Sequence, residues 1–291
     1  VGRLFAAKGR PVDHPLIVHL PASARLDDWA IEVPDGARLL AARFWPGPLT
    51  MSLRRHPRVV PEATGGQDTV GLRVPAHPVA QALLTAFGGA VAAPSANRFG
   101  AVSPTTAAHV RDDLGDAVEV VLDGGPCTVG VESTIVDLSA GAPTVLRPGA
   151  VSRDEIAWAL GAAVRAGGID AEPGAVRAPG TLASHYAPRA TVIAVPAAEV
   201  AAVVARELAA GRRVAALCGA LAGPLPAGAL WIDLGDDAAD TARRLYGALR
   251  EADDRGVAVI IAALPDARGG GLAEAIADRM RRAAGGRDQG P

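Results

Sequence analysis

The stretch AKGRPVDHPLIVH places two cations, a proline and two histidines close together near the start of the chain. Lys8 is the only lysine among 291 residues, so arginine supplies every other cation of this type. Arginine binds phosphate or carboxylate with two parallel hydrogen bonds, whereas lysine supplies a compact charge. Lys8 and Arg10, followed by the rigid Pro11, are therefore predicted to form an anion site. A solvated helix C-terminus, where cations are favoured anyway, is the alternative.

Polar residues also follow or precede several apolar runs. Ser95 and Asn97 in PSAN follow the run AVAA, and Ser133 in GVEST precedes the run TIVDL. Arg147 in LRPG stands before a Pro-Gly turn. In α/β proteins, side chains at the carboxyl ends of strands commonly bind ligands. Taken alone, PSAN is more typical of an ordinary Asn/Ser turn.

Arg73 lies inside the apolar run TVGLRVP, between Leu72 and Val74. Successive side chains of a strand point to opposite faces of the sheet, so Arg73 faces away from both neighbours. The sequence leaves two interpretations open: Arg73 lies on a solvated face, or it lines a polar cavity.

Several common sites are not indicated. The chain has no GxxxxGK[ST] phosphate-binding loop, and Ser184 in SHYAP lacks the GxSxG context of a serine nucleophile. His14 and His19 have no metal-like partner spacing, so no protein metal site is predicted. Cys127 and Cys218 lie outside any CxxC, and a disulfide framework is not expected, which favours an intracellular protein. No apolar run approaches the roughly 18 residues of a membrane span, and the net charge of −2 does not suggest a membrane or nucleic-acid protein.

The pattern of apolar residues predicts an α/β protein with two domains. We expect a first domain over 1–160, a Gly-, Ala- and Pro-rich linker over 161–190, a C-terminal domain over 191–284 and a tail over 285–291. Four apolar runs alternating with amphipathic helices predict a small parallel sheet in the C-terminal domain. The predicted strands cover 16–20, 49–55, 69–75, 90–94, 118–125, 133–139, the start of 144–160, 191–195, 213–219, 230–235 and 257–265.

Helix ends are predicted from capping residues. The helices expected near 35–44 and 77–87 follow apolar spacings of three and four. Ser103, before Pro104, is predicted to cap a helix, and Ser152 to cap another. The chain starts at Val1 within what reads as a helix, and we expect an N-terminal piece to be missing.

Taken together, these stretches form an ordered set. AKGRPVDHPLIVH, WPGPLT, DTVGLRVPAHP, AAPSAN, SPT, GVESTIVDL, VLRPGAVS and APGTLASHYAP follow one another in this chain. The set resembles the Sua5 (YrdC/YwlC) family of threonylcarbamoyl-AMP synthases, of the long Sua5 type. The resemblance implies a YrdC-like twisted open sheet with a concave, positively lined cavity, plus a Rossmann-like C-terminal Sua5 domain. It also implies a cytoplasmic nucleotidyltransferase that makes threonylcarbamoyl-AMP and pyrophosphate from L-threonine, bicarbonate or CO2 and ATP, for tRNA t6A37 biosynthesis.

The resemblance implies roles for particular residues. Lys8 and Arg10 would act in catalysis, with Mg²⁺ accompanying the ATP. His14 occupies a position that is often Asn in the family. The segment with Ser184, His185 and Tyr186 would close over the active site as a lid. The threonine site would comprise His19, Arg73, Ala93 and Ser133. The ATP site would comprise Arg10, His14, Thr69, Ser95, Asn97, Ser103, Arg147, Ser184, His185 and Tyr186.

The resemblance also sets expectations about partners and alternatives. The product would pass to the tRNA threonylcarbamoyl transferase machinery. The family segment PTETVYGLG should precede Val1, so this chain is expected to be truncated and impaired. An RNA-binding module with weak affinity is one alternative, and a carbamoyl-transfer domain of hydrogenase maturation is another, although its zinc-finger and acylphosphatase segments are missing. We expect Lys8 to lie at a cavity rim rather than in a core.

Overall fold

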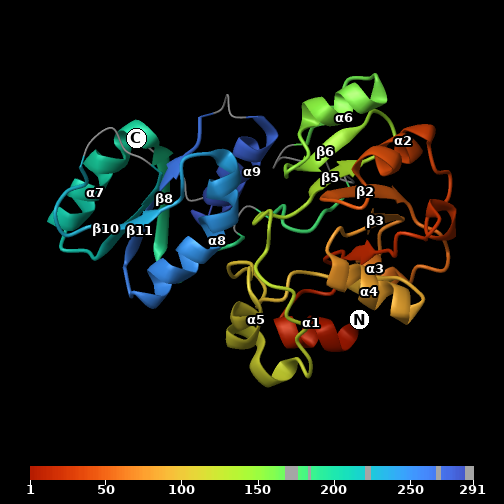
Figure 1. Ribbon diagram of the computed structural model, residues 1–291, viewed down its shortest axis with the longest axis horizontal. Helices are drawn as coiled ribbons and strands as arrows, with labels where there is room; N and C mark the ends of the chain where they lie inside the picture. The colour runs from red at the N-terminus through yellow and green to blue at the C-terminus, as the bar shows by residue number, and fades with distance from the viewer. Residues whose placement is uncertain (168–175, 183–184, 220–223, 267–269, 286–291) are drawn as a thin grey trace. The chain divides into compact units, whose positions relative to one another are not determined.

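The computed structural model describes residues 1–167, 176–182, 185–219, 224–266 and 270–285 (Figure 1). The chain forms two compact units, each with its own sheet and hydrophobic core. The first unit comprises Val1–Phe99, Arg111–Gly124 and Glu132–Thr181, and the second comprises Gly100–Val110, Gly125–Val131 and Leu182–Pro291. The division at 160 and 190 proposed from the sequence stays a prediction.

The first unit is built on a seven-stranded mixed sheet with the order β4-β1-β3-β2-β5-β6-β7. The pairs β1–β3, β2–β5 and β6–β7 are parallel, and the remaining neighbours are antiparallel. The strands are β1 (Ile17–His19), β2 (Leu49–Arg54), β3 (Thr69–Arg73), β4 (Val91–Ala93), β5 (Thr134–Asp137), β6 (Thr144–Arg147) and β7 (Arg165–Ala166).

Alternation along these strands gives the sheet one apolar face and one polar face. Val18, Leu72, Met51 and Val136 are register partners across four neighbouring strands, and all are buried in one core cluster. Residues one position away therefore lie on the opposite face. This polar face carries Ile17, His19, Thr50, Ser52, Thr69, Gly71, Arg73, Ile135 and Arg147.

Two helices cover the apolar face. Ala37 and Leu40 of α2 (Asp35–Phe44) and Ile156 of α6 (Arg153–Leu160) belong to the same core cluster as the strands. Figure 1 shows these two helices side by side. The predicted cap of α6 is confirmed, because Ser152 and Glu155 exchange hydrogen bonds of 3.1 and 2.8 Å between side chain and backbone. The other helices of this unit are α1 (Gly2–Lys8), α3 (Pro61–Thr64) and α4 (Pro78–Phe87), while α5 (Ala107–Leu114) contains residues of both units.

The second unit is built on a four-stranded sheet with the order β10-β9-β11-β8, in which all pairs are parallel. Its strands are β8 (Thr191–Pro196), β9 (Val214–Cys218), β10 (Leu230–Asp233) and β11 (Val259–Leu264). One face packs on α7 (Val200–Ala209), and the other packs on α8 (Ala238–Asp254) and α9 (Gly270–Ala283). The sequence-based α/β fold class, including the parallel sheet, is confirmed.

Two local predictions are wrong. The helix expected to start after Ser103 begins at Ala107, because Thr106 caps it by accepting a hydrogen bond of 3.3 Å from the His109 N–H. Residues 118–125 form no strand, and no described strand pairs with them. Val120 is 71% exposed and Leu122 is 57% exposed. The β-branched composition of this run favours a strand only when a neighbouring strand and a packing surface are present.

Candidate functional site

Lys8, the last residue of α1, ties this helix to the loop after β4. Its ammonium donates hydrogen bonds to the carbonyl oxygens of Ser95, at 2.6 Å, and of Asn97. The expectation that Lys8 lies at a rim is wrong, since only 6% of the residue is exposed. Burial, and then the charge of Arg10, lowers the pKa of Lys8 from 10.5 to about 8, against the opposing effect of Asp113. Lys8 is therefore a partly desolvated cation that also positions the loop of two predicted ATP residues.

Arg10 and His14 share one aromatic neighbour, Phe99. The guanidinium of Arg10 lies 5.5 Å from the Phe99 ring centroid and donates a hydrogen bond of 2.8 Å to the Pro15 carbonyl. His14 meets the same ring edge-on at 5.1 Å. Burial, and then the charge of Arg10, lowers the pKa of His14 below its usual value, which favours the neutral imidazole. Lys8 also accepts the Phe99 N–H at its carbonyl, so these residues form one cluster.

His19 and Arg73 end the neighbouring parallel strands β1 and β3 and are register partners on the polar face. Burial, and then the charge of Arg73, lowers the pKa of His19 to about 4. His19 is therefore a neutral imidazole at pH 7, next to a permanent cation. Arg73 Nε donates to the Gly47 carbonyl at 3.0 Å. Ala93 pairs with Ile17 on the other side of β1.

Ser133 lies at the same edge of the sheet, where β5 begins. The Thr134 N–H donates to the Pro48 carbonyl, so the turn that holds Arg73 through Gly47 also adjoins Ser133. Arg147 Nε and Nη2 donate to the Ser133 carbonyl at 3.1 and 2.9 Å, and Nη2 also donates to Ser133 Oγ at 3.1 Å. His19, Arg73 and Ser133, three of the predicted threonine-site residues, are thus brought to one end of the polar face.

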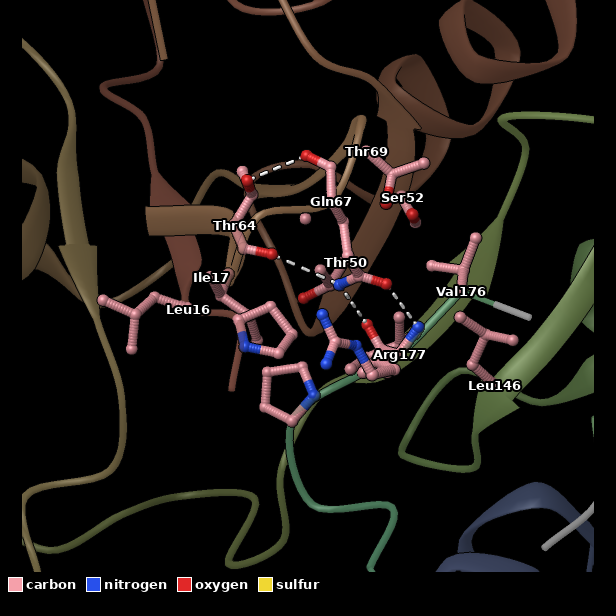
Figure 2. Close-up of a pocket in the computed structure, with 15 residues that line it drawn as sticks. Leu16, Ile17, Thr50, Ser52, Thr64, Gln67, Thr69, Leu146, Val176 and Arg177 are labelled. Carbon is pink, nitrogen blue, oxygen red and sulfur yellow. Dashed lines mark hydrogen bonds between the residues drawn. The ribbon is translucent and has the colours of Figure 1, made fainter. Parts of the chain in front are cut away.

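A small cavity of about 20 Å³ lies on the same polar face. Its lining includes Thr69, a predicted ATP residue, and a strand glycine, Gly71. The residues 176–179 cover this cavity, and Figure 2 shows the Gln67 amide bonded to both the N–H and the carbonyl of Arg177. The residues with hydroxyl groups that line this cavity are Thr50, Ser52, Thr64 and Thr69.

The remaining predicted residues belong to the second unit. Ser103 is buried in this unit, with 5% of its surface exposed. Tyr186 lies in the core of this unit, with a positive φ of 61° and its ring stacked 5.5 Å from that of Tyr246. His185 packs edge-on against Tyr186 and donates its N–H to the Arg282 carbonyl at 3.3 Å. Ser184 lies outside the described residues. The assignment of these four residues to ATP stays a prediction.

Sequence reasoning missed two residues: Thr50 on the polar face, and Gln67, which lines the cavity. Thr50, in WPGPLT, is fully buried and contacts Ser133, and Gln67 binds Arg177. The even spacing of Thr50 and Ser52 within an otherwise apolar strand was the available signal, because period-2 polarity marks a second face.

No three His, Cys, Asp or Glu side chains come together among the described residues as they would to hold a metal ion. Within the same residues, no helix is long and apolar enough to cross a membrane.

The fold defines an α/β protein with a mixed sheet, one face of which is polar, and with a second unit built on a parallel sheet. Residues 1–149 match the family model Sua5/YciO/YrdC, described as "Telomere recombination", and residues 151–285 match "Threonylcarbamoyl-AMP synthase, C-terminal domain".

Named relatives agree with the family models. A threonylcarbamoyl-AMP synthase of Pyrococcus abyssi is 40% identical, over 98% of this chain and 84% of that protein. A threonylcarbamoyl-AMP synthase of Bacillus subtilis is 37% identical, over 99% of this chain and 84% of that protein. The crystal structure of P. abyssi Sua5 complexed with L-threonine superposes with a TM-score of 0.90 at 39% identity, covering 98% of this chain and 84% of that one. The chain belongs to the Sua5 family of threonylcarbamoyl-AMP synthases.

Proposed function

We propose that this chain is a nucleotidyltransferase that joins L-threonine, bicarbonate or CO2 and ATP into threonylcarbamoyl-AMP, with release of pyrophosphate. The observation that carries the proposal is the grouping of His19, Arg73 and Ser133 at one edge of the polar face. A relative of 39% identity has L-threonine bound. The product would serve t6A37 formation through the tRNA threonylcarbamoyl transferase machinery, in the cytoplasm.

At the threonine end, Arg73 would bind the carboxylate, and Ser133 would add a hydroxyl contact. The low pKa of His19, about 4, keeps its imidazole neutral at pH 7. A neutral ring can accept a hydrogen bond from the amine or hydroxyl of threonine, which an imidazolium could not do. Ala93, beside Ile17 on the adjoining strand, would contribute backbone contacts.

At the phosphate end, Lys8 and Arg10 would carry the catalytic charge. The threonine amine captures CO2 and loses a proton to give a carbamate. A carbamate oxygen then attacks the α-phosphorus of ATP, and the bond to pyrophosphate breaks. Negative charge develops on phosphoryl oxygens in such a step, so two preorganised cations would stabilise the transition state. Thr69, Ser95, Asn97, Ser103 and Arg147, with His14, are the proposed ATP contacts.

ATP would bind with Mg²⁺, which neutralises the triphosphate when present. The described residues lack a carboxylate cluster, so their donor set fits an ion held by the phosphates and water rather than by a protein cage. Ser184, His185 and Tyr186 are proposed to join the ATP site when the linker closes.

A pyrophosphate-release assay tests the proposal. Purified chain should release pyrophosphate from ATP only when L-threonine and bicarbonate are both present, and mass spectrometry should detect threonylcarbamoyl-AMP. Pyrophosphate release that ignores threonine would contradict the proposal. Weak RNA binding is a second candidate function, and it is supported only by the cationic cluster of Lys8 and Arg10. A steep dependence of RNA affinity on salt would support it further.

A further inference from the structure

Thr50 lies beneath the predicted threonine site and contacts its serine. Thr50 is fully buried in β2, and its Oγ1 lies 2.8 Å from Ser133 Oγ. It occupies the polar face, opposite Ile135 in the register between β2 and β5. Ser133 is the one hydrogen-bond partner that the described residues offer to the Thr50 side chain. Among the described residues, the hydroxyl of Thr50 therefore acts on Ser133 alone.

The hydrogen-bond partners of Ser133 limit the directions in which its hydroxyl proton can point. Ser133 Oγ has one proton and two lone pairs. Arg147 Nη2, which can only donate, occupies one lone pair at 3.1 Å. Either hydroxyl can donate in this pair, and the other proton then lacks an acceptor among the described residues. An acceptor-only group of a ligand beside Ser133 removes this cost, because Thr50 then donates to the second lone pair of Ser133 and the Ser133 O–H donates to the ligand.

We propose that Thr50 is a positioning residue for the amino-acid substrate, which it serves by directing the Ser133 O–H at the substrate carboxylate. The inference rests on the proposed function. A carboxylate suits this place because it only accepts hydrogen bonds, and Arg73 supplies a cation across the Gly47–Pro48 turn. The reacting amine of threonine must stay free to capture CO2, so binding through the carboxylate leaves the reactive end available.

The space above Thr50 is kept open by a glycine. A Cβ added to Gly71, on the neighbouring strand, would lie 3.4 Å from Thr50 Cγ2 and 3.8 Å from Ile17 Cγ1. That methyl group would sit on the lining of the small cavity. Gly71 thus leaves space beside the Thr50 methyl group on the cavity side of the sheet, while the Thr50 hydroxyl contacts Ser133.

The test uses Thr50→Val, which removes the hydroxyl and keeps the shape. We expect the KM for L-threonine to rise about 3- to 10-fold, the range for one lost neutral hydrogen bond, while the KM for ATP stays within about twofold. Thr50→Ser should restore the KM for threonine. Thr134→Val is the matched control: its hydroxyl is equally buried but, among the described residues, bonds only to the backbone of Val151, on the opposite face of the sheet.

A double-mutant cycle separates positioning from general damage. In a Ser133→Ala background, Thr50→Val should cause no further rise in the KM for threonine, because Thr50 acts through Ser133. The rise in melting temperature produced by saturating L-threonine gives a second readout that needs no turnover, and it should shrink in Thr50→Val.

The outcomes are distinguishable. If the wild-type chain shows neither threonine-dependent pyrophosphate release nor a threonine-dependent rise in melting temperature, the proposed function itself fails. If the wild type responds and Thr50→Val matches it, the positioning role is overturned. A comparable loss in Thr134→Val, an equal rise in the KM for ATP, or an undiminished effect in the Ser133→Ala background would also overturn it.

Discussion

The two sheets of this chain differ in what their faces carry. The four-stranded parallel sheet of the second unit is covered by helices on both faces, and β9 is buried along its whole length. The seven-stranded sheet of the first unit buries only one face under α2 and α6, and its other face carries hydroxyls, His19 and Arg73. A sheet that keeps one face polar can bind a charged ligand without a separate scaffold. We therefore place the chemistry on the sheet of the first unit. The sheet of the second unit, packed on both faces, forms the core of that unit.

The largest expected effect is on the cationic cluster of the first unit. Lys8→Ala should lower kcat/KM about 10³-fold, near the upper range for loss of one preorganised charge donor. Steady-state pyrophosphate release measures this loss, and circular dichroism should show a folded protein. Lys8→Arg is the matched control, because it keeps the charge but changes the geometry at the Ser95 and Asn97 carbonyls. A near wild-type rate in Lys8→Ala would contradict the catalytic role proposed for Lys8.

The apolar face of the same sheet should govern stability instead. Leu72 is fully buried, and Leu72→Ala should lower the free energy of unfolding by about 3 kcal/mol, through lost burial and a cavity. Urea unfolding followed by fluorescence and circular dichroism measures the change. Ile261→Ala in β11, equally buried, is the counterpart in the second unit and should cost a similar amount. An unchanged unfolding midpoint for Leu72→Ala would break the distinction between the two faces.

The polar face should also make the first unit sensitive to acid. The pKa of His19 is lowered from 6.5 to about 4, so the unfolded chain binds a proton before the folded chain does. Stability is therefore lost as the pH falls from about 6.5 towards 4, by about 2 kcal/mol at pH 4.5. The difference between urea midpoints at pH 7 and pH 4.5 should be smaller in His19→Gln than in the wild type. Equal differences in both proteins would show that His19 is not the responsible group.

The smallest effect is expected at Ser52, a residue of the polar face to which no functional role is assigned. Ser52 lines the cavity, and its carbonyl, not its side chain, accepts the Leu138 N–H. Ser52→Ala should change the free energy of unfolding by less than about 0.5 kcal/mol, as measured by urea unfolding. A loss comparable to that of Leu72→Ala would mean that both faces contribute equally to stability.

Sequence patterns predicted the elements that carry their own signals. The strands β2, β3 and β5 and the parallel strands β8 to β11 were found from apolar runs, and α6 was found from its Ser152 cap. The run 118–125 was misread, because strand propensity does not reveal whether a neighbouring strand exists. The start of α5 was misplaced because Thr106, and not Ser103, caps it.

The site was only partly accessible from the sequence. Single residues suggested Lys8, Arg10 and Arg73, but the sequence could not choose between a solvated and a buried location for them. The pairing of the strands decides the location: the register of β1 with β3 puts His19 beside Arg73. These two residues are far apart in the sequence, so the sequence alone does not show that they are neighbours. Thr50 was missed because its importance lies in one contact with Ser133, which only the pairing of β2 with β5 creates.

The most direct test of the account is a crystal structure of this chain with L-threonine. We predict electron density for threonine on the polar face of the seven-stranded sheet, with its carboxylate near Arg73 and the Ser133 hydroxyl and its amine towards His19. Threonine bound at the four-stranded parallel sheet, with the polar face unchanged, would contradict it.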